Sequence, residues 1–154
     1  MKLAEALLHR KDLQTRIKEH QEALETAVVT PQGLGPDEEP QALLHAVEAS
    51  HAQLESLIVR INRTNNQALL PNGISLMEAI ARRDTLSKRI EHLKSLLKAI
   101  LGRNRREYWT DSAPVQVTHL SPEQLRAQVN GLAKDLRELD LAIQATNWSS
   151  DLIS

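Results

Sequence analysis

Four stretches of the chain carry apolar residues at alternating spacings of three and four. The first runs from Leu3 to Ala27, the second from Leu43 to Ile61, the third from Leu76 to Ile100 and the fourth from Leu125 to Ile143. This spacing places apolar side chains along one side of an α-helix. Helices of about 25 residues are each about 37 Å long. The pattern therefore predicts an all-α fold of four long helices, packed as a coiled-coil-like bundle.

Helix-boundary signals stand at the ends of these stretches. The segment Ser75-Leu76-Met77-Glu78 has the spacing of a capping box, and it follows the turn sequence Pro71-Asn72-Gly73. The segment Ser121-Pro122-Glu123-Gln124 has the same spacing, with proline at the first helical position. Gly102 stands where a C-cap glycine is expected after the third stretch. These signals set the third helix at 76–101 and start the fourth at 122.

The connections differ in character. Residues 31–40 contain three prolines and an acidic run, which indicates a mobile loop between the first two helices. Residues 102–121 form the longest connection, and within it residues 115–120 alternate in the manner of a short strand. We therefore expect a short strand there beside the four helices.

The chain also repeats itself. A shift of 73 residues aligns seven identical pairs within fifteen positions: Leu3/Leu76, Glu5/Glu78, Ala6/Ala79, Arg10/Arg83, Leu13/Leu86, Arg16/Arg89 and Ile17/Ile90. A shift of 82 aligns five more: Leu54/Leu136, Leu57/Leu139, Ile61/Ile143, Thr64/Thr146 and Asn65/Asn147. The repeat predicts a duplicated antiparallel helical hairpin, residues 1–70 and 74–154, within one domain of residues 1–154. Two hairpins that share only heptad statistics are the alternative, but they leave the paired Glu and Arg positions unexplained.

Composition narrows the class of protein. The chain has no Cys, which excludes a disulfide framework, a thiol nucleophile and a thiolate metal site. Its 19 basic and 20 acidic residues nearly cancel, so the total charge does not favour nucleic acid or an anionic membrane. No stretch approaches about 18 uninterrupted apolar residues, the length that spans a bilayer. A signal-peptide core is also missing, so we expect a cytoplasmic protein without membrane association.

Several segments resemble a family of small, uncharacterised bacterial helical proteins often labelled "septicolysin". The segments are 1–8, Arg60-Ile61-Asn62-Arg63-Thr64-Asn65, 72–73, 78–84, 138–140 and 147–148. The resemblance covers most of the chain and implies a helical fold, but it brings no established activity. A thiol-activated pore-forming toxin needs a Cys, an export signal and a membrane-inserting surface. Because the sequence has none of these, we reject cytolysis as the function.

Two arginines lie on the apolar stripes. Arg10 falls amid the first stripe, and Arg83 takes the equivalent place in the third. A buried charge is costly unless it is paired, so we expect acceptors for each, with Asp140 at about the level of Arg83. One interpretation is structural: buried arginines that set helix register. The other is a pocket for a small anionic or polar ligand, for which the candidate residues are Arg10, Asn62, Arg63, Asn65, Arg83, Asp140 and Asn147.

Other chemistry is weakly indicated. Glu48 and His51 have the Glu-x-x-His spacing of di-iron bundles, and Glu5, His9 and Asp12 share a helix face, but the repeat completes neither set. We therefore expect no metal and no cofactor. Three arginines and two aromatic residues within 102–109 suit nucleic acid, yet helix-dipole complementation explains the arginines equally well. Phosphate-loop, nucleophile-elbow and zincin motifs are missing, so nothing indicates an enzyme.

The sides of the helices opposite the stripes carry isolated apolar residues, namely Leu8, Val59, Leu96 and Leu141. Self-association through these faces, or through strand pairing at 115–117, would cover them. We therefore predict a non-enzymatic homo-oligomeric interaction or structural protein. A binder of a small anionic ligand at the Arg/Asn residues is the alternative, and nucleic-acid binding through 102–109 is the third hypothesis.

Overall fold

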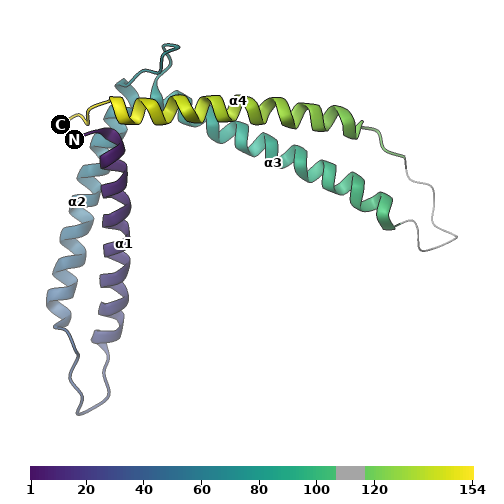
Figure 1. Cartoon of the computed structure of the whole chain (residues 1–154). Coiled ribbons are helices and arrows are strands. Elements are labelled where there is room, and N and C mark those ends of the chain that lie inside the picture. Colours follow the sequence, from purple (N-terminus) through teal and green to yellow (C-terminus); the bar gives the residue numbers. More distant parts are fainter. Residues whose placement is uncertain (107–116) are drawn as a thin grey trace. The chain divides into compact units, whose positions relative to one another are not determined.

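Four α-helices make up the regular structure of the computed structural model, which describes residues 1–106 and 117–154 and, for 103–106, only the backbone. The helices are α1 (Leu3–Val28), α2 (Pro40–Gln67), α3 (Leu76–Arg106) and α4 (Pro122–Ser149). The predicted all-α class is therefore confirmed (Figure 1). The predicted strand is wrong for residues 117–120, which form coil and a bend, whereas residues 115 and 116 lie outside the described ranges.

The chain packs as two compact units. The first comprises Met1–Leu69 with Gln144–Ser154, and the second comprises Leu70–Ile143. In the first unit α1 and α2 lie side by side as a hairpin, and both chain ends lie at the end of it where α1 begins (Figure 1). In the second unit α3 runs beside the part of α4 before residue 144 (Figure 1).

Each unit buries the stripe predicted from its sequence. In the first unit the buried stripe residues of α1 and α2 are Leu3, Ala6, Leu13, Ile17, Ala27, Leu43, Val47 and Ile61. Leu54 and Ile58 of the predicted stripe are half-buried, and Leu57, beside the stripe, is buried. In the second unit the buried stripe residues are Leu76, Ala79, Ile90, Leu125, Val129 and Ile143. Removing one such Leu or Ile side chain from water contributes about 1.5–3 kcal/mol. The spacing of apolar residues therefore accounts for which face of each helix is buried.

Helix starts use the predicted residues. The Ser75 hydroxyl oxygen accepts the Glu78 backbone N–H at 3.1 Å, and Ser121 accepts that of Gln124 at 3.3 Å. Each of these bonds satisfies an amide that has no partner within its helix. At the start of α1 the side chain comes from inside the helix instead: the Glu5 carboxylate accepts the backbone N–H of Lys2, the residue before the helix, at 2.7 Å. The predicted starts of α3 and α4 are thus confirmed.

The turn before α3 forms as predicted, but the end of α3 does not. Gly73 takes a φ of +82°, a conformation that suits glycine, and Asn72 Oδ1 accepts the Ile74 N–H at 3.3 Å. Gly102, predicted as a C-cap, instead lies inside α3, which continues to Arg106. The residues after Gly102 include three arginines, which are good helix formers, so one glycine does not stop the helix.

Candidate functional site

The seven predicted ligand-binding residues fall into the two units. Arg10, Asn62, Arg63, Asn65 and Asn147 belong to the first unit, and Arg83 and Asp140 belong to the second. Their burial differs widely: Asn147 is buried, Arg10, Asn65, Arg83 and Asp140 are half-buried, and Asn62 and Arg63 are exposed.

We had expected Arg83 to pair with Asp140, but in the second unit it pairs with Asp84 instead. Its Nε and Nη2 donate to Asp84 Oδ1 at 3.0 and 2.7 Å. Its side chain is 34% exposed, so the guanidinium reaches the edge of the stripe, where the neighbouring carboxylate meets it. Asp140 makes no hydrogen bond or ion pair with any residue that the structure describes. The expected Arg83–Asp140 pair is wrong because the guanidinium has a nearer acceptor on its own helix.

In the first unit Arg10 corrects a second expectation. Its half-buried side chain has no hydrogen-bond or ion-pair partner among residues 1–106 and 117–154. A fully buried arginine in this state would be strongly destabilising. Partial exposure resolves the cost, because the apolar stem packs on the helix while the guanidinium stays hydrated. The prediction that Arg10 needs protein acceptors is therefore wrong.

The motif Arg60-Ile61-Asn62-Arg63-Thr64-Asn65 binds the last residues of the chain. Thr64 is only 1% exposed, and its hydroxyl donates to the Arg60 carbonyl at 2.8 Å while accepting the Ile153 N–H at 3.0 Å. Arg60 Nε donates to the Ile153 carbonyl at 3.0 Å, and Arg63 Nη1 donates to the Ser154 carbonyl at 3.5 Å. Three side chains of this motif thus hold two residues of backbone.

The start of the chain completes this tail site, which we define as Lys2, Arg60, Arg63 and Thr64 with residues 149–154. Leu3 N–H donates to the Ser150 carbonyl at 3.0 Å and Leu152 N–H donates to the Met1 carbonyl at 2.9 Å. These bonds make an antiparallel bridge between Lys2 and Asp151. In the tail site the polar groups of the motif are already engaged by the protein's own backbone.

The Lys2 ammonium group reinforces this bridge. Lys2 Nζ lies 2.9 Å from Asp151 Oδ1 and donates to the Ser149 carbonyl at 3.1 Å. The hydrogen bond from Lys2 is the main cause that lowers the pKa of the Asp151 carboxyl below its usual range, and the positive charge of Lys2 is the second cause. The carboxylate is therefore ionised at neutral pH and stays so to a lower pH than an ordinary Asp.

Sequence reasoning missed three residues of the tail site: Lys2, Arg60 and Thr64. The available signal was weak. Arg60 and Thr64 are four residues apart and so share a helix face, but nothing local shows that residues 150–154 return to that face. Contacts between positions about ninety residues apart depend on the tertiary fold.

The residues considered for metal binding remain at the surface. Glu48 and His51 are exposed, as are Glu5, His9 and Asp12, and Glu5 is engaged as the cap of α1. Within the described ranges no three His, Asp or Glu side chains converge in a manner that could hold a metal ion. The 102–109 segment proposed for nucleic acid is described only to residue 106, so Tyr108 and Trp109 lie outside the described residues.

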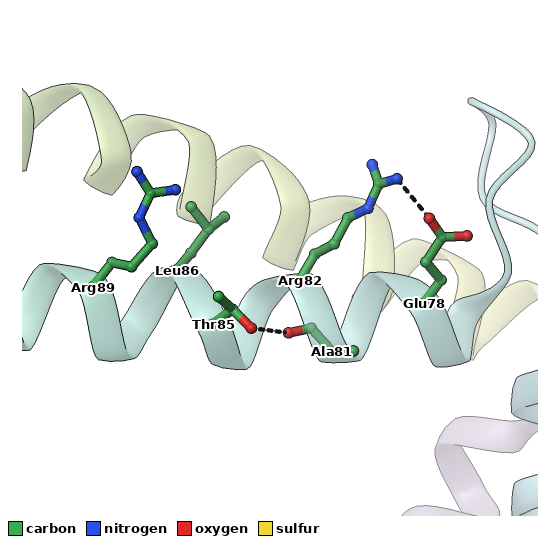
Figure 2. Close-up of a pocket in the computed structure, with 6 residues that line it drawn as sticks. All are labelled: Glu78, Ala81, Arg82, Thr85, Leu86 and Arg89. Carbon is green, nitrogen blue, oxygen red and sulfur yellow. Dashed lines mark hydrogen bonds and ion pairs between the residues drawn. The ribbon is translucent and has the colours of Figure 1, made fainter.

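A second feature, which the sequence reasoning did not identify, is a set of three hollows on α3. Figure 2 shows the first, a cavity of about 390 Å³ lined by Glu78, Ala81, Arg82, Thr85, Leu86 and Arg89. The next, of about 290 Å³, shares Thr85 and Arg89 with it and adds Lys88, His92, Leu93 and the α4 residue Gln128. A third, of about 720 Å³, is lined by Lys94, Leu97, Lys98, Leu101 and Gly102. With about 3.6 residues per turn, the residues of the first two hollows lie on one side of α3 and those of the third lie on the other side.

None of the helices within the described ranges is both long enough and apolar enough to cross a membrane. Comparison with curated proteins finds no significant match. Among solved structures, the chain is similar to the crystal structure of a functionally unknown conserved protein from Corynebacterium diphtheriae. The identity is 31%, the alignment covers 99% of both chains, and the TM-score is 0.92. This similarity agrees with the helical-bundle fold.

A family model matches residues 10–152, and its description is a family of unknown function, DUF6847. The matched range includes the complete Arg60–Asn65 motif and most of the tail site. An uncharacterised family was expected from the sequence resemblance, and this is confirmed, whereas the label "septicolysin" stays a prediction. The chain thus belongs to the DUF6847 family, whose function is unknown.

Proposed function

We propose that the protein is a non-enzymatic interaction protein that acts as a homo-oligomer. The observation that carries the proposal is the exposure of large apolar side chains on the outer faces of the helices. Leu8 is 57% exposed and Leu141 is 71% exposed, and both lie opposite their buried stripes, as predicted; Val59 is exposed too. Leu96, predicted to join them, is half-buried instead.

Trp148 is another exposed apolar side chain. It is 57% exposed near the end of α4, although tryptophan is among the side chains that gain most from burial. Single exposed aliphatic residues are ordinary on a soluble protein, but an exposed tryptophan is typical of contact surfaces. A second copy of the chain would remove this apolar area from water.

The duplicated hairpin is part of the same proposal. Thr64 and Thr146 carbonyls accept the N–H groups of Ala68 and Ser150, a pair of bonds related by the shift of 82 residues. The Leu70 N–H donates to the Ile74 carbonyl, and the Leu152 N–H donates to the Met1 carbonyl. The donors of these two bonds are related by the shift of 82 residues, and the acceptors are related by the shift of 73. These matched bonds support an internal repeat, and a repeated unit presents similar surfaces twice.

Binding of a small anionic ligand at the Arg/Asn residues is placed second. Arg10 supports it, because this half-buried guanidinium has no partner in the described part of the chain. Arg63 weakens it, because its guanidinium already donates to the carbonyl of Ser154. Nucleic-acid binding through 102–109 stays third, because the 19 basic and 20 acidic residues of the chain nearly cancel.

Sedimentation velocity and native mass spectrometry test the proposal. We expect a multiple of the 17.3 kDa chain mass at micromolar concentration, with no added mass. The double variant Leu141→Gln/Trp148→Gln should shift the equilibrium toward monomer, and the control Gln144→Ala, on the same helix, should not. A wild-type protein that is monomeric at every micromolar concentration tested refutes the oligomer. An extra mass that is lost on denaturation supports the ligand hypothesis instead.

A further inference from the structure

We propose that Asn72 is a site of spontaneous deamidation in the folded protein and that Asn130 is protected from the same reaction. The sequence contains the dipeptide Asn-Gly at 72–73 and again at 130–131. Glycine after asparagine favours this reaction, because no side chain hinders the approach of its nitrogen to the asparagine carboxamide. Both dipeptides belong to the second unit and have the same chemistry, so a difference between them comes from the local fold.

The reaction is a cyclisation followed by hydrolysis. The backbone nitrogen of Gly73 loses its proton and attacks Cγ of Asn72, which forms a new C–N bond. The bond between Cγ and Nδ2 then breaks, and the side-chain nitrogen leaves as ammonia. Water opens the resulting five-membered imide at either of its carbonyls, which gives aspartate or its β-linked isomer, isoaspartate. The net reaction consumes water and releases ammonia, and nothing is oxidised or reduced.

Solvent access does not distinguish the two sites. Asn72 and Asn130 are both exposed, as are the glycines that follow them, so water reaches each dipeptide. A Cβ added at Gly73 or Gly131 would meet no atom of the described residues within 4 Å. Burial and crowding are therefore alike at the two sites, and the backbone conformation decides which asparagine reacts.

In α4 the backbone opposes the reaction. Asn130 and Gly131 lie inside this helix, which runs from Pro122 to Ser149. A helical side chain points back toward the N-terminus, whereas the Gly131 nitrogen lies on the C-terminal side of Asn130. The Gly131 N–H is also directed at the carbonyl four residues earlier. Attack therefore requires the helix to open in its interior, which breaks several bonds together.

In the turn before α3 the backbone favours the reaction. Asn72 Oδ1 accepts the Ile74 N–H at 3.3 Å, and this bond spans Gly73, so the carboxamide lies beside the nitrogen that must attack it. The Gly73 N–H donates to the Leu70 carbonyl at 2.9 Å, and this bond must open before the nitrogen can react. Opening an exposed turn costs less free energy than opening the interior of a helix. The reactive arrangement is therefore reached more often at Asn72 than at Asn130.

The products change the turn in different ways. Either product adds a negative charge to a chain whose net charge is −1. Isoaspartate also adds a methylene group to the main chain between Leu70 and Ile74, where the Leu70 N–H donates to the Ile74 carbonyl at 2.9 Å. We expect isoaspartate to weaken this bond and the bond from Gly73, and aspartate to leave both in place.

Peptide mapping of the wild-type protein tests the proposal. The protein is incubated at mildly alkaline pH, once folded and once in guanidinium chloride, and the peptides that contain Asn72 and Asn130 are followed by mass spectrometry. Deamidation raises the mass of a peptide by one unit, and an isoaspartate-specific methyltransferase identifies the β-linked product. In the folded protein Asn72 should react at least about tenfold faster than Asn130, because Asn130 must first open a helix. In guanidinium chloride the two rates should be similar, since both dipeptides are then unfolded.

Asn72→Gln is the matched variant. Glutamine keeps a carboxamide but must close a six-membered ring, which forms much more slowly than the five-membered one. The folded variant, its helical content checked by circular dichroism, should therefore gain no acidic species on ion-exchange chromatography while the wild type does. Amide hydrogen exchange at Leu70 and Gly73 should accelerate in the purified isoaspartate form and not in the aspartate form.

Three results would overturn the proposal. If Asn72 stays intact in the folded protein while it reacts in guanidinium chloride, the turn protects this residue as the helix protects Asn130. Equal rates at Asn72 and Asn130 in the folded protein would show that backbone conformation does not control the reaction. An undiminished gain of acidic species in Asn72→Gln would place the reaction at another residue.

Discussion

Thr64 links the family-matched motif to the end of the chain, and Thr64→Val isolates what its hydroxyl does. Valine keeps the size and the branched shape of threonine but offers no hydrogen-bond acceptor. In the native protein the Thr64 hydroxyl accepts the Ile153 N–H at 3.0 Å and donates to the Arg60 carbonyl at 2.8 Å. The substitution removes both bonds and leaves the Ile153 amide without an acceptor.

The two bonds are not equally important. The Arg60 carbonyl lies inside α2 and already accepts a helical N–H, so losing its second bond costs little. The Ile153 amide donates to Thr64 Oγ1, and the Thr64 side chain is almost fully buried. Leaving such a donor unpaired costs about 1–3 kcal/mol. We therefore expect Thr64→Val to lower the free energy of unfolding by about 1–2 kcal/mol, the lower part of that range, because the tail can move to meet water.

Thr85→Val is the matched control. Thr85 is exposed on α3, and its hydroxyl makes only the equivalent intrahelical bond, to the Ala81 carbonyl at 2.9 Å (Figure 2). We expect this change to alter stability by no more than about 0.5 kcal/mol. The difference between the two variants is then the worth of the contact with Ile153.

Urea unfolding at equilibrium measures both variants, and amide hydrogen exchange reports on Ile153 directly. Exchange of the Ile153 N–H should accelerate in Thr64→Val but not in Thr85→Val. Equal stabilities for the two variants, together with an unchanged exchange rate at Ile153, would show that Thr64 does not hold the tail. The interpretation of the motif as a tail site would then be wrong.

Three further predictions follow from burial, charge and backbone conformation. Lys2 lowers the pKa of Asp151 in the folded protein, so the stability from this ion pair is fully present above the unfolded pKa of about 3.9. That stability is lost as the pH falls through the lower pKa of the folded state. Asp151→Asn should therefore reduce the loss of stability in acid, measured by urea unfolding between pH 2 and 7. Leu13→Ala should destabilise the protein by about 2–5 kcal/mol in thermal or urea unfolding, and the exposed Leu8→Ala should change it by less than about 0.5 kcal/mol; equal losses would contradict the assigned faces. Gly102→Ala should raise stability by about 0.5–1 kcal/mol, because the residue lies inside α3 and no atom of the described residues stands within 4 Å of the added Cβ. A loss of stability would instead indicate that Gly102 is a C-cap in the left-handed conformation.

The motif Arg60–Asn65 illustrates how a local pattern can suggest the wrong chemistry. Two arginines and two asparagines in six residues resemble a polar binding site, and sequence reasoning assigned three of them to a ligand. In the fold, the arginines bind backbone carbonyls of residues 153 and 154, and Asn62 points to solvent as an exposed side chain. A ligand hypothesis for such a motif therefore needs a count of the partners that the chain itself provides.

The sequence by itself determined the four helices, the starts of α3 and α4, and most of the buried faces. The apolar spacing, the serines at positions 75 and 121 and the turn at Pro71-Asn72-Gly73 act over four residues or fewer, so they can be read locally. The same local reasoning failed at Gly102, where the strong helix formers that follow outweigh one glycine.

Only the tertiary structure decided which polar groups meet. The bonds that close the tail site join residues 89 to 151 positions apart, such as Thr64 with Ile153 and Met1 with Leu152. No periodicity encodes such pairs, because they depend on where a whole helix returns rather than on its own pattern. Arg83 shows the same limit at short range. Its place on the stripe is visible in the sequence, but the choice of Asp84 over Asp140 depends on how far a half-buried guanidinium extends toward water.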